Sequence, residues 1–545
     1  MNFLRLSVAL LIGSAAGVAN AQLRVVTYNT LGKPAGPTGS VNQTDLSEVR
    51  TIFSAIAATD RNGIAKRPDI IALQEQTTFA LIGDDFLLDS TALRIAEELN
   101  DLYGVTSYEV ERNRIGGVLQ AYVYDSATVA VSGSSLSIFS DGPRPAMRTR
   151  FQPVGYSSDD ASVYLYNSHM KAGDSGSDQA DRLSEAQQIR FDADLLGSDA
   201  NVIYLGDFNI KTSSQAAYTE LRSAGNAQAV DPVGLSSWPN SLEARPYLSQ
   251  STRTGSIGDG GAGGGVDDRF DMQLVTDDLL DGEGLSYLGP TAVGLGALEH
   301  SYQAFGNDGT SFNAAITSPP TGRSQPASVL SALFNFSDHL PVIADYQVPA
   351  IAELDAFMVP STLELGEDFD LDVTLRNAAD VVHENGADEL DYILAATGAG
   401  VGGGAGTIAA LSAGDLFSIS LDTSSVGMKM GEIIVLSTSE GAEVVSASVP
   451  FAYEVLDVAT QPGDFTGDGL VDNDDLNLLL NTWGDPAAPL PTGWNGSPPI
   501  GASIDNDELN DLLSNWGVGF AVPEPTSWIL LAGCGLPWYT GRRRG

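Results

Sequence analysis

The sequence is poor in cysteine and in positive charge. Its single cysteine, Cys534, excludes an intramolecular disulfide, so stability has to come from packing and bound metals. Lysine and arginine together number 27 against 70 aspartates and glutamates, which gives a net charge of -43. A surface with this charge repels polyanions and attracts divalent cations, which excludes a basic groove for nucleic acid.

Long helices and pervasive disorder do not fit the composition. Hydrophobic residues make up 43% and aromatic residues 8%, as in globular domains, and 59 glycines favour loop-rich β modules over long helices. A chain of 545 residues exceeds what one hydrophobic core supports, so we expect two to four domains.

The N-terminal segment has the pattern of a secretory signal. Arg5 precedes an apolar run that continues to Val18, and the small residues Ala19-Asn20-Ala21 follow. We therefore predict a signal peptide over residues 1–21 with cleavage before Gln22.

The C-terminal segment, residues 522–545, has a second targeting pattern. Val522-Pro523-Glu524-Pro525 precedes an apolar stretch of about a dozen residues, short of the roughly 20 that a membrane span needs, and three arginines end the chain. The segment resembles a PEP-CTERM sorting signal. The resemblance implies transient membrane contact, cleavage by a sorting protease of the exosortase type, and a secreted or cell-surface location. A plain C-terminal anchor is the alternative.

Residues 23–348 mix strand-like and helix-like patterns. Apolar runs predict strands at 25–28, 70–73, 118–124, 163–167, 202–205, 270–275 and 342–346. Apolar residues at helical spacing predict helices over 46–56 and 183–196. We expect an α/β domain whose helices cover the outer faces of its sheets.

Two further segments differ from this pattern. Residues 255–265 are too rich in glycine to pack and are predicted to form a mobile loop. Residues 350–458 alternate apolar and polar positions, which predicts a small, Ig-like β-sandwich without visible chemistry.

Polar residues that can bind metal or move protons follow the predicted strands. A strand end is a rigid platform that opens onto solvent, where a site needs its functional groups. The candidates are Asn29, Glu75, Asn167, His169, Asp207, Asn209, Asp271, Asp338 and His339. Of the other histidines, His300 is placed in a loop and His383 in the sandwich, and neither matches a motif.

Five motifs occur in a defined order along this region. They are Tyr28-Asn29, Leu73-Gln74-Glu75, Asn167-Ser168-His169, Gly206-Asp207-Phe208-Asn209 and Ser337-Asp338-His339-Leu340-Pro341. In this order they resemble the endonuclease/exonuclease/phosphatase superfamily. The resemblance implies a four-layered, DNase I-like α/β sandwich over residues 23–348, a divalent metal site and phosphoester hydrolysis.

The resemblance also implies a metal site. Hydrolysis of a phosphodiester places negative charge on the phosphate and the leaving oxygen, so a cation and hydrogen-bond donors are required. Glu75 with Asn29 would hold Mg²⁺ or Mn²⁺ through oxygen ligands. Asp271, assigned from its Arg269-Phe270-Asp271 context, is a further metal ligand.

The remaining motif residues are expected to be catalytic. His339 would hydrogen-bond Asp338 and then either take a proton from the attacking water or donate one to the phosphate. Asp207 is the other candidate for aligning or deprotonating that water. Asn209 would donate to the phosphate and His169 would contact the leaving group or the phosphate. Arg144 and Arg148 are candidate substrate contacts.

Three functions are compatible with these residues. The first is an extracellular phosphodiesterase, in particular a nuclease that scavenges environmental nucleic acid, although the acidic surface opposes nonspecific binding of polyanions. The second is a phospholipase C, a sphingomyelinase or a small-molecule phosphatase. The third is an inactive calcium-dependent module for surface attachment or assembly.

Residues 461–518 contain a calcium-loop pattern. Gly469 stands at the sixth loop position, where the turn is sharp, and oxygen ligands are expected from Asp464, Thr466, Asp468, Leu470 (through its carbonyl), Asp472 and Asp475. With the helix pattern that follows, this loop resembles a type I dockerin repeat, which implies helices, bound Ca²⁺ and a cohesin-like partner. A second copy ends at Trp516-Gly517, but its loop has Pro498 and Pro499 among the positions where ligands are expected.

Overall fold

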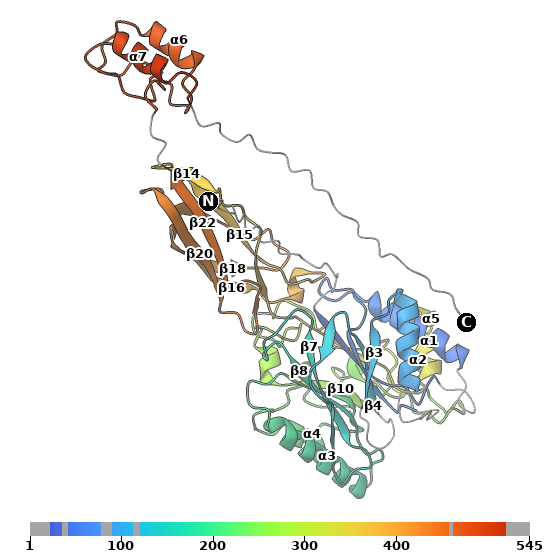
Figure 1. Ribbon diagram of the computed structural model, residues 1–545. Helices are drawn as coiled ribbons and strands as arrows, with labels where there is room; N and C mark the ends of the chain where they lie inside the picture. Colours follow the sequence, from blue (N-terminus) through green and yellow to red (C-terminus); the bar gives the residue numbers. More distant parts are fainter. Residues whose placement is uncertain (1–21, 35–41, 78–89, 113–119, 457–460, 519–545) are drawn as a thin grey trace, which may run out of the picture. The chain divides into compact units, whose positions relative to one another are not determined.

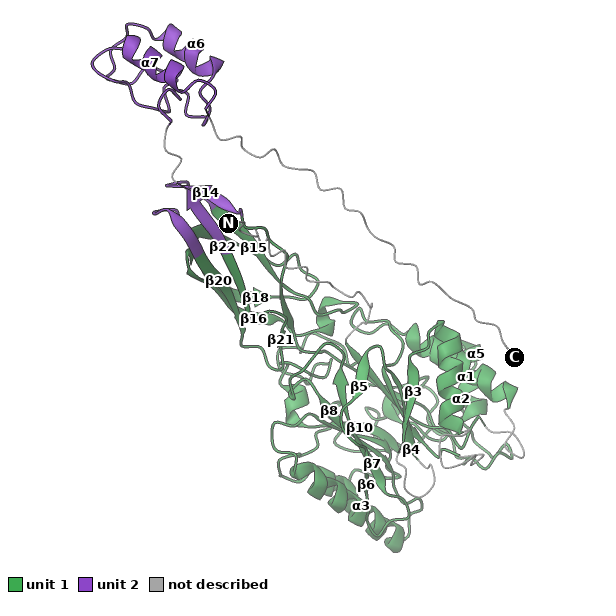
Figure 2. Cartoon of the chain, in the orientation of Figure 1, with its two compact units in different colours: residues 1–359, 370–421, 430–451 green, residues 360–369, 422–429, 452–545 purple. Residues whose placement is uncertain are grey.

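The computed structural model describes residues 22–34, 42–77, 90–112, 120–456 and 461–518. The predicted signal peptide and sorting segment lie outside these residues. No helix in these ranges is long and apolar enough to cross a bilayer. The chain divides into two compact units: residues 1–359, 370–421 and 430–451 form one, and 360–369, 422–429 and 452–545 form the other (Figure 2).

Two six-stranded mixed sheets form the N-terminal part of the first unit (Figure 1). The first has the order β11 (Gln303–Ala304), β12 (Val342–Tyr346), β1 (Leu23–Asn29), β2 (Ile70–Gln74), β4 (Gln120–Asp125) and β3 (Tyr108–Arg112). The second has the order β10 (Asp271–Val275), β9 (Val202–Asp207), β8 (Val163–His169), β7 (Ala146–Pro153) and β5 (Val129–Val131), with β6 (Leu136–Ile138) also paired to β7.

The two sheets pack face to face through a shared apolar core. The first sheet contributes Val25, Ile70, Ala72 and Tyr122, and the second contributes Met147, Phe151, Val163, Leu165, Ile203 and Leu205, all buried. The Tyr122 hydroxyl reaches across this core and shares its one hydrogen between the carbonyl oxygens of Met147 and Leu165, at 3.0 and 2.8 Å. The strand ends of both sheets are thereby held in one rigid frame.

Helices cover the outer faces of the sheets. Their apolar residues cluster with buried residues of the two sheets, and Phe336 of α5 packs against Tyr28 of β1 with ring centroids 5.7 Å apart. The helices are α1 (Gln43–Ala57), α2 (Thr91–Tyr103), α3 (Gly176–Asp194), α4 (Ala216–Leu221) and α5 (Ala327–Phe336). The mixed α/β architecture predicted from the sequence is confirmed.

Local sequence signals explain where these helices begin. Asn42 and Ser90 cap α1 and α2 by accepting backbone N–H groups, and Ser175 forms a reciprocal capping box with Asp178 at the start of α3. Sequence periodicity identified α1 and α3 but left out α2, α4 and α5.

Most of the glycine-rich segment 255–265 is exposed, but two of its residues are anchored by contacts with residues outside it. The Ala262 N–H donates to Asp338 Oδ2 at 2.7 Å, and Asp259 forms a salt bridge with the buried Arg253 at 2.7 Å. Buried partners outside the segment replace the apolar side chains that it lacks.

Ten strands between residues 351 and 456 form two five-stranded sheets. One is ordered β17 (Gly400–Val401), β19 (Asp415–Leu421), β15 (Asp370–Asn377), β13 (Ile351–Leu354) and β21 (Glu443–Val444). The other is ordered β14 (Thr362–Glu364), β22 (Ser448–Leu456), β20 (Gly427–Ser437), β16 (Leu390–Gly398) and β18 (Gly403–Ile408). Alternating burial along β15 and β22 shows one covered face on each sheet.

Two short helices, α6 (Asn473–Asn481) and α7 (Asn506–Ser514), end the described chain. Each begins with a capping box, formed by Asp472 with Asp475 and by Asp505 with Glu508. The Asp475 carboxylate also accepts the N–H groups of Phe465 and Thr466, both at 2.8 Å, and so holds the preceding loop against α6.

A buried ion pair joins the first and last strands of the N-terminal sandwich. Arg24 on β1 donates to both carboxylate oxygens of Asp345 on β12, at 2.7 and 2.9 Å, and both side chains are 1% exposed. Asp345→Ala leaves this arginine buried without its carboxylate partner, with only backbone carbonyls to accept from it, so we expect a loss of about 3–5 kcal/mol in the free energy of unfolding. Urea unfolding followed by circular dichroism measures it.

Glu299→Ala is the matched control, because the Glu299 side chain that pairs with Arg61 is 78% exposed. Its expected cost is at most about 1 kcal/mol. Equal losses in the two variants would contradict the role assigned to the buried pair.

Candidate functional site

The candidate residues meet where strand ends of the two sheets come together. Parallel β1 and β2 end side by side at Asn29 and Gln74, and parallel β8 and β9 end side by side at His169 and Asp207. Antiparallel β10 begins at Asp271, directly opposite Asp207. The carboxyl ends of parallel strands lie at the same edge of a sheet, so this topology gathers side chains that are far apart in the sequence.

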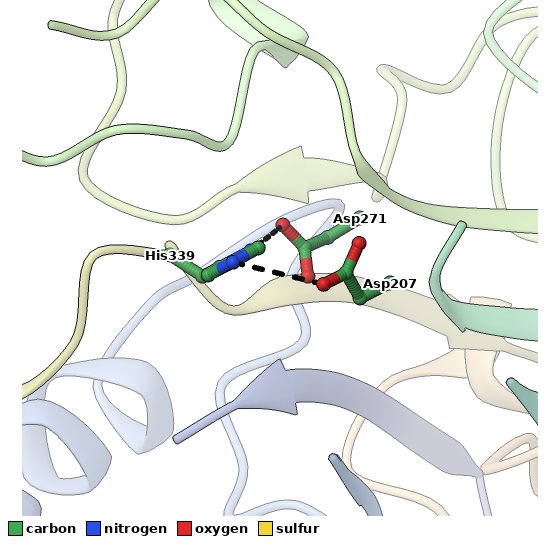
Figure 3. A group of neighbouring side chains, drawn as sticks. All are labelled: Asp207, Asp271 and His339. Atoms are coloured by element: carbon green, nitrogen blue, oxygen red, sulfur yellow. Dashed lines mark hydrogen bonds and ion pairs between the residues drawn. The ribbon is translucent and has the colours of Figure 1, made fainter. Parts of the chain in front are cut away.

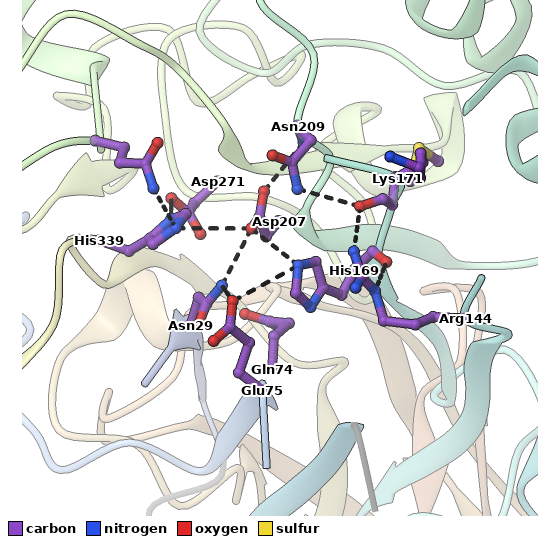
Figure 4. A network of polar contacts seen from close by, with 12 residues as sticks. Asn29, Gln74, Glu75, Arg144, His169, Lys171, Asp207, Asn209, Asp271 and His339 are labelled. Carbon is purple, nitrogen blue, oxygen red and sulfur yellow. Dashed lines mark hydrogen bonds and ion pairs between the residues drawn. The ribbon is translucent and has the colours of Figure 1, made fainter. Parts of the chain in front are cut away.

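Asn29 joins two carboxylates at the centre of the site (Figure 4). Its Nδ2 donates to Glu75 Oε1 at 3.0 Å and to Asp207 Oδ2 at 3.1 Å, while its Oδ1 accepts from the Leu31 N–H at 3.1 Å. Asn29 was predicted to offer an oxygen to the metal. In this arrangement it holds Glu75, predicted as a metal ligand, close to Asp207, predicted to align or deprotonate the water.

The partner of His339 differs from the one predicted. His339 Nδ1 lies 2.8 Å from Asp271 Oδ2 (Figure 3). The same carboxylate oxygen accepts the Ser249 hydroxyl at 2.6 Å. The expected partner, Asp338, instead accepts from the Ala262 N–H and from Gln250 Nε2. Asp271, predicted as a metal ligand, is therefore the carboxylate that orients the imidazole.

Ligand atoms of Asp207, Asp271 and His339 all lie within 4.8 Å of one another, which is close enough for a metal trio. Both imidazole nitrogens of His339 have close neighbours, Asp271 at Nδ1 and Gln250 at Nε2, which favours a histidine–aspartate pair over a metal site there. The oxygens of Glu75 and Asp207 remain as the hard ligands for a cation.

Two histidines flank Asp207 with opposite electrostatics. His169 Nε2 lies 3.5 Å from Asp207 Oδ2, and burial lowers the pKa of His169 to about 4 despite that carboxylate. Burial also acts to lower the pKa of His339, but the charges of Asp271 and Asp207 outweigh it and raise the pKa well above its ordinary value. At neutral pH the site therefore pairs a neutral imidazole with a charged one.

The turn after β9 places Asn209 beside these groups. The Asn209 N–H donates to Asp207 Oδ1 at 3.0 Å, and its Nδ2 donates to the Met170 carbonyl at 3.1 Å, with the backbone in the left-handed region at φ 51°. Gly206 has φ 131°, and a Cβ at this position would come within 2.0 Å of the Ser168 carbonyl. Only glycine lets the ends of β8 and β9 approach this closely.

The two candidate arginines have different positions. Arg144 donates to the carbonyls of His169 and Met170, both at 2.8 Å, and therefore borders the site. Arg148 pairs with Asp192 of α3 at 2.7 Å and lies over the Tyr164 ring, so the structure does not bring it to the catalytic groups.

Two residues that sequence reasoning missed contact the His339 pair. Gln250 Nε2 lies 2.6 Å from His339 Nε2, and Ser249 donates to Asp271. Both are in a loop between predicted elements, where neither periodicity nor motif spacing marks a residue as functional.

The amides of Gln74 and Asn167 were in the motifs but had no assigned role. Gln74 Nε2 donates to Asn167 Oδ1 at 2.8 Å, and Asn167 Nδ2 donates to the carbonyls of Leu73 and Ala121. This buried pair ties the two sheets together directly beneath the site.

Neither a family model nor a curated protein sequence matches the chain. Solved structures give distant likenesses. The human nocturnin catalytic domain with bound sulfate is 14% identical, with 61% of this chain and 96% of that chain covered and a TM-score of 0.32. D. rerio TDP2 complexed with a single-strand DNA product is 15% identical, with 60% and 100% covered and a TM-score of 0.33.

A protein from Beutenbergia cavernae described as endonuclease/exonuclease/phosphatase is 14% identical, with 80% of this chain and 100% of that chain covered and a TM-score of 0.33. We base no conclusion about fold or activity on likenesses at this level.

Asp271→Asn should lower the pKa of His339, because it removes a charge and a hydrogen bond that stabilise the imidazolium. Asp338→Asn should lower it less, since the Asp338 carboxylate is bound to Ala262 and Gln250. NMR titration of the two histidines in the metal-free protein measures both effects.

The raised pKa of His339 has a defined effect on stability. Its contribution is fully present below the unfolded value of about 6.5 and is lost only as the pH rises through the folded pKa. For His169 the sign is opposite: stability is retained above about pH 6.5 and falls as the pH drops toward 4.

In the titration of the two variants, a larger change in the pKa of His339 in Asp338→Asn than in Asp271→Asn would contradict the pairing of His339 with Asp271.

Proposed function

We propose that this chain is a metal-dependent phosphoesterase that hydrolyses phosphodiester bonds and belongs to the endonuclease/exonuclease/phosphatase superfamily. One observation carries the proposal: Asp207 lies within 4 Å of Asn29, His169 and His339, which come from three separate segments of the chain. Such a constellation can bind a cation, donate to phosphate oxygens and move a proton within one site.

The residues fit a divalent cation. One oxygen of Glu75 and one of Asp207 lie close to the same amide nitrogen of Asn29, and both residues offer the carboxylate oxygens that Mg²⁺ and Mn²⁺ prefer. Glu75 and Asp207 would hold the ion. When bound, it would neutralise phosphate charge and lower the pKa of a water molecule.

Three side chains would carry out proton transfer and hydrogen-bond donation to the substrate. Asp271 holds His339 and stabilises its charged form, and movement of the Gln250 amide away from Nε2 would let that nitrogen donate to the phosphate. Asp207 is then the group that aligns the attacking water and accepts its proton. His169 presents Nε2 toward Asp207 and Glu75 from the other side, in position to donate to the leaving oxygen.

The substrate class is phosphodiesters, with environmental nucleic acid the first to test. A net charge of -43 opposes long polyanions, which favours short fragments or less charged esters. We assign the protein to the outside of the cell, through the N-terminal signal and the C-terminal sorting segment that the sequence predicts.

His339→Ala should reduce turnover at least about 10²-fold, because it removes a charged donor from the reacting phosphate. Hydrolysis of bis-p-nitrophenyl phosphate with Mg²⁺ or Mn²⁺ measures it. His300→Ala is the matched control, since His300 hydrogen-bonds Tyr287 away from the site, and should keep the wild-type rate. An unchanged rate in His339→Ala would remove this residue from the mechanism.

A substrate panel separates the alternatives. Plasmid DNA, short oligonucleotides, sphingomyelin and a phosphomonoester are each tested with Mg²⁺, Mn²⁺ and EDTA. Cleavage of sphingomyelin alone would identify a lipid phosphodiesterase, and activity on none of them would favour the inactive surface module.

We propose, separately, that the loop before α6 binds Ca²⁺. Carboxylate oxygens of Asp464, Asp468 and Asp475 lie within 4.8 Å of one another, and the loop carries glycine at its sixth position. The corresponding stretch before α7 has prolines in place of these acids. These two observations support our proposal of a dockerin-like module that has one calcium-binding loop and a cohesin-like partner.

Asp468→Ala should weaken Ca²⁺ binding at least about tenfold, because an exposed ligand is removed from a loop whose affinity depends on its charge count. Isothermal titration of the full chain measures it. Asp507→Ala, an exposed acid at the start of α7, is the control and should bind as the wild type does. Equal weakening in both variants would contradict the loop assignment.

A further inference from the structure

Gln22 is the residue at which the exported chain would begin. It follows the small residues Ala19-Asn20-Ala21, where the predicted signal peptide ends. It also lies directly before β1, the central strand whose last residue is Asn29 of the candidate site. The chemistry of Gln22 therefore bears on how this strand starts.

The surroundings of Gln22 use only one end of its side-chain amide. Oε1 accepts the Val382 N–H at 2.9 Å, and a Cβ at Gly386 would come within 2.6 Å of the same oxygen. Gln22 is 0% exposed, yet its Nε2 has no hydrogen-bond partner among the described residues. A buried donor without a partner is costly, so these contacts favour a side chain that keeps the carbonyl and lacks the amide nitrogen.

The charges around the backbone of Gln22 favour a neutral chain end. The Lys66 ammonium donates to the Gln22 carbonyl and pairs with Asp69 at 2.8 Å, with both side chains buried. A chain that begins at Gln22 carries an α-ammonium on the residue whose carbonyl Lys66 contacts. Two cations would then lie beside one carboxylate, and neutralising the α-nitrogen removes their repulsion.

We propose that Gln22 is a modification site, at which the N-terminal glutamine of the exported chain closes to pyroglutamate. The neutral α-amine attacks Cδ, a bond forms between the α-nitrogen and Cδ, and the bond between Cδ and Nε2 breaks. Nε2 leaves as ammonia with the proton that the α-nitrogen gives up, so the step needs no oxidant, reductant or water. An α-amine has a pKa of about 7.7–8.0, so a share of it is neutral at neutral pH.

The product suits these surroundings. The lactam retains a carbonyl to accept from Val382, loses the nitrogen that has no acceptor, and carries an uncharged N–H in place of the ammonium near Lys66. It also leaves no free amine for an aminopeptidase at the start of β1. The inference rests on the proposed export with cleavage before Gln22, and it is independent of the proposed phosphoesterase activity.

Mass spectrometry of the exported protein tests the modification. The full chain is expressed with its own signal in a bacterial host, recovered from the cell envelope and the medium, and digested with pepsin. The acid of this digestion keeps a free amine protonated and so prevents ring closure during handling. The first peptide should begin at residue 22 and weigh less than its encoded sequence by one ammonia.

Gln120 provides a matched control within the same digest. Its buried Nε2 also has no partner among the described residues, but it lies inside the chain and has no free α-amine. The peptide that contains Gln120 should therefore keep its full mass.

Gln22→Ala separates ring closure from cleavage. Because residues 19–21 are unchanged, this variant should be cleaved at the same place, and Edman degradation should read its sequence from the first residue. The wild type should be blocked in Edman degradation until pyroglutamate aminopeptidase is applied to the unfolded chain.

A second measurement asks whether the folded protein is stabilised by the ring. The mature chain, released with Gln22 as its first residue, is unfolded in urea with and without prior ring closure by glutaminyl cyclase. Closure should shift the unfolding midpoint to higher urea concentration, and the same treatment should leave the midpoint of Gln22→Ala unchanged.

A free glutamine at position 22 of the freshly exported chain would overturn the inference, as would a lower urea midpoint for the closed form. A first peptide that begins at another residue would overturn it together with the predicted cleavage site. If the ring is present and the chain cleaves none of the panel substrates, the proposed phosphoesterase activity fails and the modification stands.

Discussion

The site depends on one carboxylate, Asp207, whose charge draws groups from both sheets to a single point. Asn29 from the first sheet donates to it, and His169 and His339 lie on its two sides. Asp207 is 2% exposed, so its charge is poorly screened by water and acts strongly on each neighbour. The packing of the two sheets, tied by Tyr122 and by the Gln74–Asn167 amide pair, keeps these neighbours within reach.

The two histidines show how different surroundings give the same side chain different charge states. Both are buried, yet only His339 has a carboxylate hydrogen-bonded to its second nitrogen, and this partner outweighs the cost of burying its charge. His169 has no carboxylate hydrogen-bonded to its second nitrogen, so burial prevails and the imidazole stays neutral. A charged donor on one side of Asp207 and a neutral donor on the other suit a reaction in which charge develops at both phosphate and leaving oxygens.

The large negative charge of the chain and a phosphate substrate are compatible only through a cation. Acidic residues outnumber basic ones by 70 to 27, and Arg144 is the one candidate arginine that the structure leaves beside the site. A bound divalent ion at Glu75 and Asp207 would reverse the local charge without changing the surface. The same logic applies to the loop before α6, where three carboxylates converge and a cation would offset their repulsion.

The sequence by itself determined which residues stand at strand ends, because periodicity marks a strand and motif order marks its last residues. Strands β1, β2, β8, β9 and β12 and the residues Glu75, His169, Asp207 and His339 followed from it. Which groups hydrogen-bond was decided only by the tertiary structure: Asp271 rather than Asp338 orients His339, and Asp338 binds the glycine-rich segment. Asp338 and His339 lie between α5 and β12, outside the named strands, and their side chains have different partners, so neighbours in the sequence need not pair. The contacts of Gln250 and Ser249 depend on distances between packed layers, and no one-dimensional pattern records those distances.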